Sequence, residues 1–307
     1  MHSNKNLSVV IFAFGFMGKY SLEGLQRNKI LNIKGIIIPK INKFYYSNLN
    51  LKKIDHKIKI LQSDKKNQIF NFIKNLKPDI VLISTFNKIF DKKILKLSKF
   101  INIHHGKLPK QKGRASINWA ILMGRNSIYL TFHQVIPKLD SGKIILQKKI
   151  DIKKNDNYQT IQKKIGKYLK FNISRILLKY LQNKISLKKN DSRKETWNCS
   201  RNPEDGLINF FKKREDVHNL IRACKNKSFG AFCYLKEKKI IIMESSIKKS
   251  KKYEGIIPGR ITQIYKNGNI DCLCKNGPIT IKKIYYKNKI MTPSKIIRST
   301  RDTLLND

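Results

Sequence analysis

Strand-length apolar runs alternate with helical patterns along the first half of the chain. The runs at 7–14, 33–38 and 80–85 are short and rich in isoleucine and valine, which predicts buried strands. Between them, residues 21–31 and 65–77 carry apolar side chains at helical spacing. This alternation predicts an α/β domain with a mainly parallel sheet and helices on both faces.

The pattern changes in the second half of the chain. Residues 157–183 form a long amphipathic pattern, which predicts a helix that covers the sheet. The polar segment that follows is short of aliphatic residues and contains turn formers, which indicates a linker. Alternating runs beyond it are separated by Asn267-Gly268 and Asn276-Gly277, pairs typical of β-hairpin turns. We therefore predict a first domain at 1–185, a linker at 186–202 and a small β-rich, barrel-like domain at 203–307.

Candidate chemistry lies where one predicted strand ends. Asn102 and His104 are two residues apart in a strand-like run, and alternate residues of a strand face the same side. The segment 106–113 cannot continue this strand, because its glycines and proline interrupt the ladder. A polar pair followed by such a loop is typical of reaction sites in open α/β sheets, and Asp140 supplies a carboxylate further on. The alternative is a buried histidine satisfied by the protein and an ordinary turn aspartate.

The same residues resemble a known family, the 10-formyltetrahydrofolate-dependent formyltransferases. The family pattern is Asn-x-His, then Leu-Pro-x-x-Arg/Lys-Gly, then Leu-Asp-Ser/Thr-Gly. Here it reads Asn102-Ile103-His104, Leu108-Pro109-Lys110-Gln111-Lys112-Gly113 and Leu139-Asp140-Ser141-Gly142. Motifs of this kind in this order are far more specific than a lone Asn-x-His. The resemblance covers nearly the whole chain.

The resemblance implies a Rossmann-like formyltransferase domain, 10-formyltetrahydrofolate as the formyl donor and a catalytic trio without metal. Asn102 would donate an amide N–H to the oxyanion that forms during transfer. His104 would donate to the same oxygen or take the proton of the amine, since imidazole titrates near neutrality. Asp140 would hold that imidazole in one tautomer and favour its charged form.

The resemblance also implies where the substrates bind. The pterin of the donor is expected between the loop 86–90 and the segment 135–140. The contact residues expected there are Phe86, Asn87, Ile89, Ile136 and Leu139. Apart from the resemblance, Lys107, Lys112 and Arg114 lie in the loop beside the polar pair, which predicts that they hold a diphosphate, and arginine is suited to bidentate phosphate contact. The alternative for each lysine is a solvated side chain without a ligand.

The turn 15–18 after the first strand is available to a substrate, and we assign Gly15 to substrate binding. It resembles part of a dinucleotide-binding fingerprint. The third glycine and the acidic ribose-binding residue are missing, which argues against a nicotinamide cofactor.

The family divides chiefly by its amine acceptor. The stretch 113–120 differs from the pattern of the tRNA enzymes, and the stretches 105–109, 131–133 and 201–206 resemble the branch that acts on nucleotide-linked amino sugars, which we predict as the substrate. Departures at Lys112, Pro137-Lys138 and Asn209-Phe210 leave methionyl-tRNA as the alternative acceptor. A folate hydrolase of the same fold, which releases formate, is a further alternative.

The net charge is +46 over 307 residues, and its lysines are spread from end to end. Such a surface attracts any polyanion at low salt, including tRNA and nucleotide diphosphates. The charge therefore permits a nucleic-acid partner without identifying one. A nucleic-acid-coating protein would need stacking aromatics among its basic residues, a pattern found only at 44–50 and 282–287.

The sequence predicts a cytoplasmic protein with no membrane partner. No apolar run approaches the roughly 20 residues of a membrane span. Residues 7–18 are interrupted by Gly15 and Gly18 and have no small-residue cleavage site, so no signal peptide is expected. The 5 cysteines lack metal-like spacing and predict reduced thiols. The expected partners are a nucleotide sugar or an aminoacyl-tRNA, and the assembly considered is a homodimer.

Overall fold

The computed structural model describes residues 7–40, 54–86, 88–249 and 251–305. The chain divides into two compact units. The first comprises Met1–Gly113, Ile128–Ile150 and Gln162–Asn198, and the second comprises Arg114–Ser127, Asp151–Ile161 and Cys199–Asp307. The domain boundaries expected from the sequence stay a prediction.

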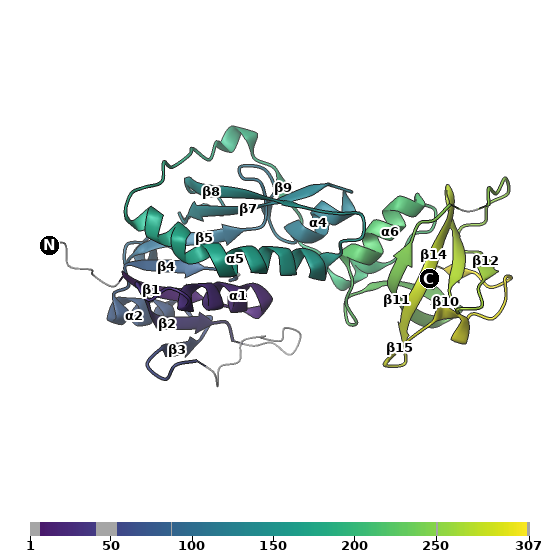
Figure 1. Cartoon of the computed structure of the whole chain (residues 1–307), viewed down its shortest axis with the longest axis horizontal. Coiled ribbons are helices and arrows are strands. Elements are labelled where there is room, and N and C mark those ends of the chain that lie inside the picture. Colours follow the sequence, from purple (N-terminus) through teal and green to yellow (C-terminus); the bar gives the residue numbers. More distant parts are fainter. Residues whose placement is uncertain (1–6, 41–53, 87, 250, 306–307) are drawn as a thin grey trace. The chain divides into compact units, whose positions relative to one another are not determined.

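The first unit is built on one seven-stranded sheet with the order β3-β2-β1-β4-β5-β7-β8 (Figure 1). The strands β1 to β5 pair in parallel, and β7 runs antiparallel to β5. The mainly parallel sheet predicted from the sequence is therefore confirmed. Their bounds are β1 Leu7–Phe12, β2 Leu31–Ile38, β3 Lys59–Gln62, β4 Ile80–Ile83, β5 Lys99–His104, β7 Ser127–Gln134 and β8 Ile144–Asp151.

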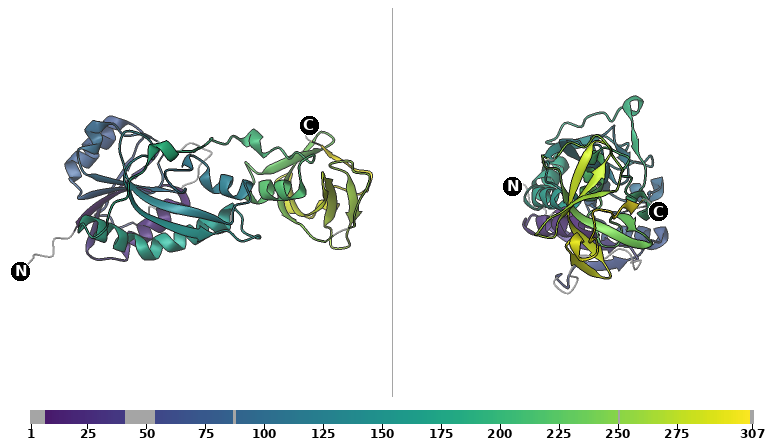
Figure 2. Two further views of the ribbon diagram at one scale, coloured as in Figure 1. Left: turned by 90° about the horizontal axis from the view of Figure 1, so that it is seen from above. Right: turned by 90° about the vertical axis from the view of Figure 1, so that its right-hand side faces the viewer.

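Helices cover both faces of this sheet, as the left view of Figure 2 shows. On one face α1 (Gly15–Gln26) lies beside α5 (Tyr158–Leu181), where the Ser174 hydroxyl donates to the Gly24 carbonyl at 2.7 Å. A Cβ on Gly24 would lie 2.6 Å from a methyl of Ile173, so glycine permits this close approach. On the other face α2 (Lys66–Leu76) and α3 (Lys92–Leu95) enclose an apolar core with β1, β4 and β5.

The first helix begins earlier than its hydrophobic pattern indicates. The pattern predicts a helix over 21–31, whereas α1 starts at Gly15 and ends at Gln26. The supposed turn 15–18 is the first turn of this helix. A Cβ on Gly18 would lie 2.7 Å from the backbone of Ala13, so the side-chain-free residue lets the helix begin directly after the strand.

The second unit is β-rich, as predicted. Its antiparallel sheet has the order β12-β13-β14-β11-β10-β16, with β15 paired to β14, and forms a half-barrel. Both predicted Asn-Gly turns are present, with φ of +81° at Gly268 and +126° at Gly277. The elements are α4 Ser116–Leu122, α6 Arg214–Ala223, β10 Ala231–Leu235, β11 Lys238–Ser246, β12 Ile261–Ile264, β13 Ile270–Cys274, β14 Gly277–Tyr286, β15 Lys289–Met291 and β16 Leu304–Leu305.

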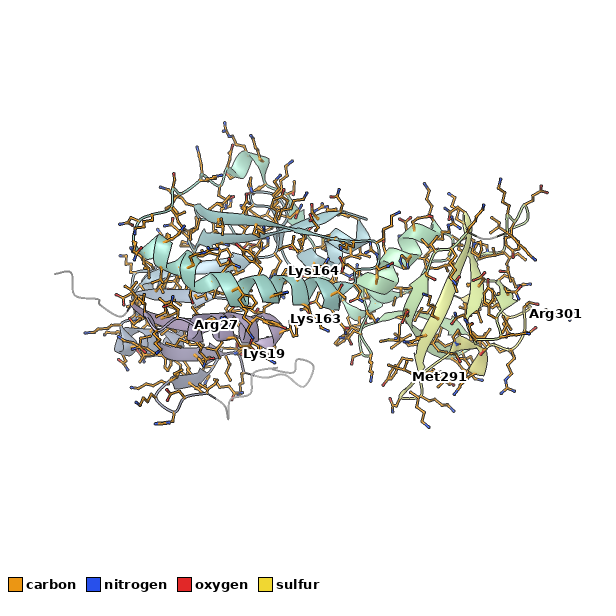
Figure 3. All side chains as sticks on the ribbon, viewed as in Figure 1. Lys19, Arg27, Lys163, Lys164, Met291 and Arg301 are labelled. Carbon is orange, nitrogen blue, oxygen red and sulfur yellow. The ribbon has the colours of Figure 1, made fainter. Side chains whose placement is uncertain are left out.

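Basic side chains project from both units. Figure 3 labels Lys19 on α1, Arg27 directly after this helix, Lys163 and Lys164 on α5, and Arg301 in the second unit. The positive charge is thus distributed over the surface as it is along the sequence. Among the described helices, none is both long enough and apolar enough to cross a membrane.

Candidate active site

Asp140 lies at the centre of a cluster of polar side chains in the first unit. Its Oδ2 is 3.5 Å from Nδ1 of His104, and its Oδ1 is 3.5 Å from Nε2 of His133. The Asn102 amide donates to Oδ1 at 3.4 Å, and the Gly113 backbone N–H donates to Oδ2 at 3.1 Å. The Asn102, His104 and Asp140 side chains therefore meet, as the sequence motifs predict.

Strand register explains this meeting. Asn102 and His104 occupy alternate positions of β5, and both contact the same carboxylate. In the antiparallel β5–β7 pair, Asn102 lies directly opposite His133. Asp140 follows β7 in a tight turn and has φ of +47°, a left-handed conformation that aspartate tolerates better than most residues.

The protein backbone fixes the tautomer of His104. Its Nε2 is 2.7 Å from the Gln111 carbonyl, a contact that requires a proton on Nε2. In the neutral ring, Nδ1 then carries the lone pair and faces Asp140. The expectation that Asp140 sets the tautomer is therefore corrected, because the shorter contact is with Gln111. A proton added to Nδ1 would lie between the imidazole and the carboxylate.

His133 and Asn102 form a hydrogen-bonded pair. Nδ1 of His133 donates to the Gln134 carbonyl at 2.7 Å, so Nε2 accepts from the Asn102 amide at 3.0 Å. The Asn102 N–H groups are thus directed at His133 and Asp140. To donate to a substrate oxygen, Asn102 must exchange one of these contacts.

Burial and the neighbouring polar groups shift the pKa of Asp140 in opposite directions, and the same holds for His104. Burial by itself favours the neutral acid of Asp140, but the His133 and His104 imidazoles and the Gly113 N–H together hold its pKa below the ordinary value. Burial lowers the pKa of His104 by more than Asp140 and the Gln111 carbonyl raise it. At neutral pH the site therefore holds an ionised carboxylate beside a neutral imidazole.

A cavity that is partly open to solvent extends from this cluster. Asn102, His133 and Asp140 line this cavity, whereas His104 is not among its lining residues. The rest of the lining is mainly apolar and includes four of the residues expected to contact the donor: Phe86, Ile89, Ile136 and Leu139. Asn87, the fifth, lies outside the described residues.

Lys112 does not face a substrate. Its side chain is 0% exposed, and its ammonium donates to the Ser141 hydroxyl and to Glu195 at 2.7 Å each. The predicted contact of Lys112 with a diphosphate is therefore corrected, because protein groups surround the ammonium. The arginine or lysine of the motif here supports the turn that carries Asp140.

The other expected substrate contacts lie at the surface. Lys107 is exposed, with its ammonium 4.9 Å from the centre of the Tyr129 ring. Gly15 has φ of +59° at the start of α1, and a Cβ there would meet open space. Arg114 is exposed and belongs to the second unit. Substrate binding by these residues stays a prediction.

The ion pair of Lys112 with Glu195 makes a pH-dependent contribution to stability. Its hydrogen bond with Lys112 holds the pKa of Glu195 below the ordinary value of 4.5. A lowered carboxyl pKa stabilises the fold above the ordinary pKa, and this stabilisation is lost as pH falls through the folded-state pKa. We therefore expect Glu195→Gln to lower the melting temperature at neutral pH, by an amount that shrinks below pH 4.5.

Thermal unfolding of both proteins across this pH range checks the prediction. Glu254→Gln, at an exposed carboxylate of the second unit, is the control for the loss of one charge. A difference between wild type and Glu195→Gln that stays constant from neutral to acid pH would contradict it.

The sequence motifs missed two parts of the site. His133 belongs to none of the motifs, and only the pairing of β5 with β7 brings it to Asn102. Glu195 carries no local signal, because its partner Lys112 is 83 residues away along the chain.

Two family models match this chain. One, described as formyl transferase, matches residues 49–175, and the other, formyl transferase C-terminal domain, matches residues 201–301. The chain belongs to the formyltransferase family.

Two curated relatives of this chain carry different names. The chain is 31% identical over 248 residues to the bifunctional polymyxin resistance protein ArnA of Wigglesworthia glossinidia brevipalpis, which covers 78% of this chain. The chain spans only 38% of that relative's length. It is 27% identical to the methionyl-tRNA formyltransferase of Malacoplasma penetrans (strain HF-2), over 94% of this chain and 92% of that protein.

A solved structure shares the fold. The N-formyltransferase from Helicobacter canadensis, in complex with folinic acid and dTDP-3-aminofucose, has a TM-score of 0.62. It is 21% identical, and the match covers 91% of this chain and all of that one.

Proposed function

We propose that this protein transfers the formyl group of 10-formyltetrahydrofolate to the amine of a nucleotide-linked amino sugar. The observation that carries the proposal is the meeting of Asn102, His133 and the ionised Asp140 at the end of a mainly apolar cavity. A flat aromatic pterin suits an apolar slot, and its formyl group would lie at the polar end.

Asn102 and the pair of Asp140 and His104 have different tasks in this reaction. The amine attacks the formyl carbon, the bond from that carbon to N10 breaks, and tetrahydrofolate leaves with a proton on N10. Asn102 donates to the formyl oxygen as this oxygen gains negative charge. Asp140, which lines the cavity, takes the proton of the amine, shares it with Nδ1 of His104 3.5 Å away, and returns it to N10 as tetrahydrofolate leaves.

Two observations support a sugar as the acceptor. A structural neighbour is complexed with dTDP-3-aminofucose, and the sequence stretches 105–109, 131–133 and 201–206 resemble the sugar branch.

Methionyl-tRNA is the second candidate acceptor. It is favoured by the match to a methionyl-tRNA formyltransferase over nearly the full length of both chains. A net charge of +46 also suits a polyanionic substrate.

The deciding experiment measures tetrahydrofolate release from 10-formyltetrahydrofolate with both acceptors side by side. One set contains UDP- and dTDP-linked 3-amino and 4-amino sugars, and the other contains initiator methionyl-tRNA, at a salt concentration of about 0.15 M to limit unspecific attraction. Release that requires a sugar supports the proposal. Release only with the tRNA replaces it by the second candidate, and formate production without any acceptor indicates a hydrolase.

A further inference from the structure

A segment of the expected linker lies against the catalytic loops of the first unit. We call residues 188–198 the strap. Its Lys188 pairs with Ile144 through two backbone hydrogen bonds of 2.9 Å, and its β9 (Trp197–Asn198) pairs in parallel with β6 (Lys112–Gly113). The strap therefore contacts both the loop before Gly113 and the turn that carries Asp140.

Asn190 is a residue of the strap that hydrogen-bonds directly to the turn carrying Asp140. Its Nδ2 donates to the backbone carbonyl of Asp140 at 2.9 Å and to that of Gly142 at 3.0 Å. The Oδ1 of the same amide is buried and has no hydrogen-bond partner among the described residues. The amide is thus oriented by its two donor contacts alone.

The turn held by Asn190 has a conformation that few sequences adopt unaided. Asp140 has φ of +47°, outside the usual regions for a residue with a side chain. Gly142 lies so close to Gln134 that an added Cβ would be 1.9 Å from its carbonyl oxygen. Ser141, which lies between these two residues, is also held in place. Its hydroxyl accepts a hydrogen bond from the buried Lys112 ammonium, which donates as well to Glu195 of the strap.

This geometry has a direct consequence for catalysis. The Asp140 carboxylate must reach Nδ1 of His104 with one oxygen and Nε2 of His133 with the other, at 3.5 Å each. A small rotation of the turn would break one of these contacts. We infer that Asn190 is a positioning residue, whose two hydrogen bonds to the turn aim the Asp140 carboxylate between the two imidazoles; this rests on the proposed function.

The test replaces Asn190 by leucine, which keeps the approximate size and the zero charge but removes both donors. Asn172→Leu is the matched control, because Asn172 also donates to a backbone carbonyl, that of Tyr168 on α5. We expect Asn190→Leu to lower kcat by up to roughly 100-fold through misalignment, with KM for both substrates little changed. Asn172→Leu should retain the wild-type kcat.

A double-mutant cycle separates positioning from general destabilisation. If Asn190 acts through Asp140, Asn190→Leu should cause little further loss in a protein that already carries Asp140→Asn. This comparison uses the residual activity at high enzyme concentration. A wild-type kcat in Asn190→Leu, or an equal loss in both backgrounds, would overturn the inference.

An activity-independent measurement keeps this test distinct from that of the proposed function. The side-chain ¹⁵N and ¹H resonances of His104 and His133 should shift in Asn190→Leu and stay unchanged in Asn172→Leu. If the wild-type protein transfers no formyl group, the proposed function fails while this spectrum still reports on the position of Asp140. Unchanged resonances of both histidines in Asn190→Leu would refute the positioning role.

Discussion

Asp140→Asn is expected to lower kcat for formyl transfer by roughly 10³- to 10⁴-fold while the protein stays folded. The amide keeps the size of the side chain but carries no charge. The imidazole of His104 then faces a neutral group when it takes up a proton, and the proton of the attacking amine loses its nearest anionic acceptor. An amide NH₂ would also face Asn102 or Gly113, both of which donate to the carboxylate in the native site.

The measurement is kcat with the acceptor that supports tetrahydrofolate release by the wild-type protein, together with the circular dichroism spectrum and the melting temperature of the variant. The melting temperature should fall slightly at neutral pH, because Asp140 has a lowered pKa and stabilises the fold when ionised. Asp55→Asn, at an exposed residue that bonds within its own turn, controls for the chemical change. Turnover close to wild type in a folded Asp140→Asn protein would remove Asp140 from the mechanism.

Asn102→Ala is expected to lower kcat by roughly 10²- to 10³-fold, the usual cost of removing one oxyanion donor. Asn102 lies in the cavity lining, and its Nδ2 is 3.0 Å from Nε2 of His133. The contact to the formyl oxygen strengthens only as that oxygen gains charge. The loss should therefore appear in kcat, with KM for the formyl donor changed little.

Steady-state kinetics of Asn102→Ala with both substrates varied checks this prediction, and Asn172→Ala on α5 is the matched control. A rise in KM at unchanged kcat would assign Asn102 to substrate binding alone. His133→Asn tests the other member of the hydrogen-bonded pair of Asn102 and His133. This substitution leaves Asn102 in place but removes the imidazole that accepts a hydrogen bond from the Asn102 amide.

The sequence predicted the helices and strands whose apolar residues recur with a regular period along the chain. The helix expected at 65–77 is α2, and the strand expected at 80–85 contains β4, because burial of one face imposes a period that the sequence displays. The Asn-Gly turns at Gly268 and Gly277 were equally predictable, since left-handed backbone conformations select glycine. The helix α1 shows the limit, because its first turn has no apolar repeat and depends on the fit of Gly18 against Ala13.

The sequence by itself determined the family, the mainly parallel sheet and the residues Asn102, His104 and Asp140, because these follow from periodicity and from motifs in a fixed order. Only the tertiary structure decided how those residues are held. The tautomer of His104 depends on the Gln111 carbonyl, the burial of Lys112 depends on Glu195, and the turn at Asp140 is bonded by Asn190. Each of these contacts joins a side chain to a distant segment or to a backbone atom, and a one-dimensional pattern carries no record of such distances.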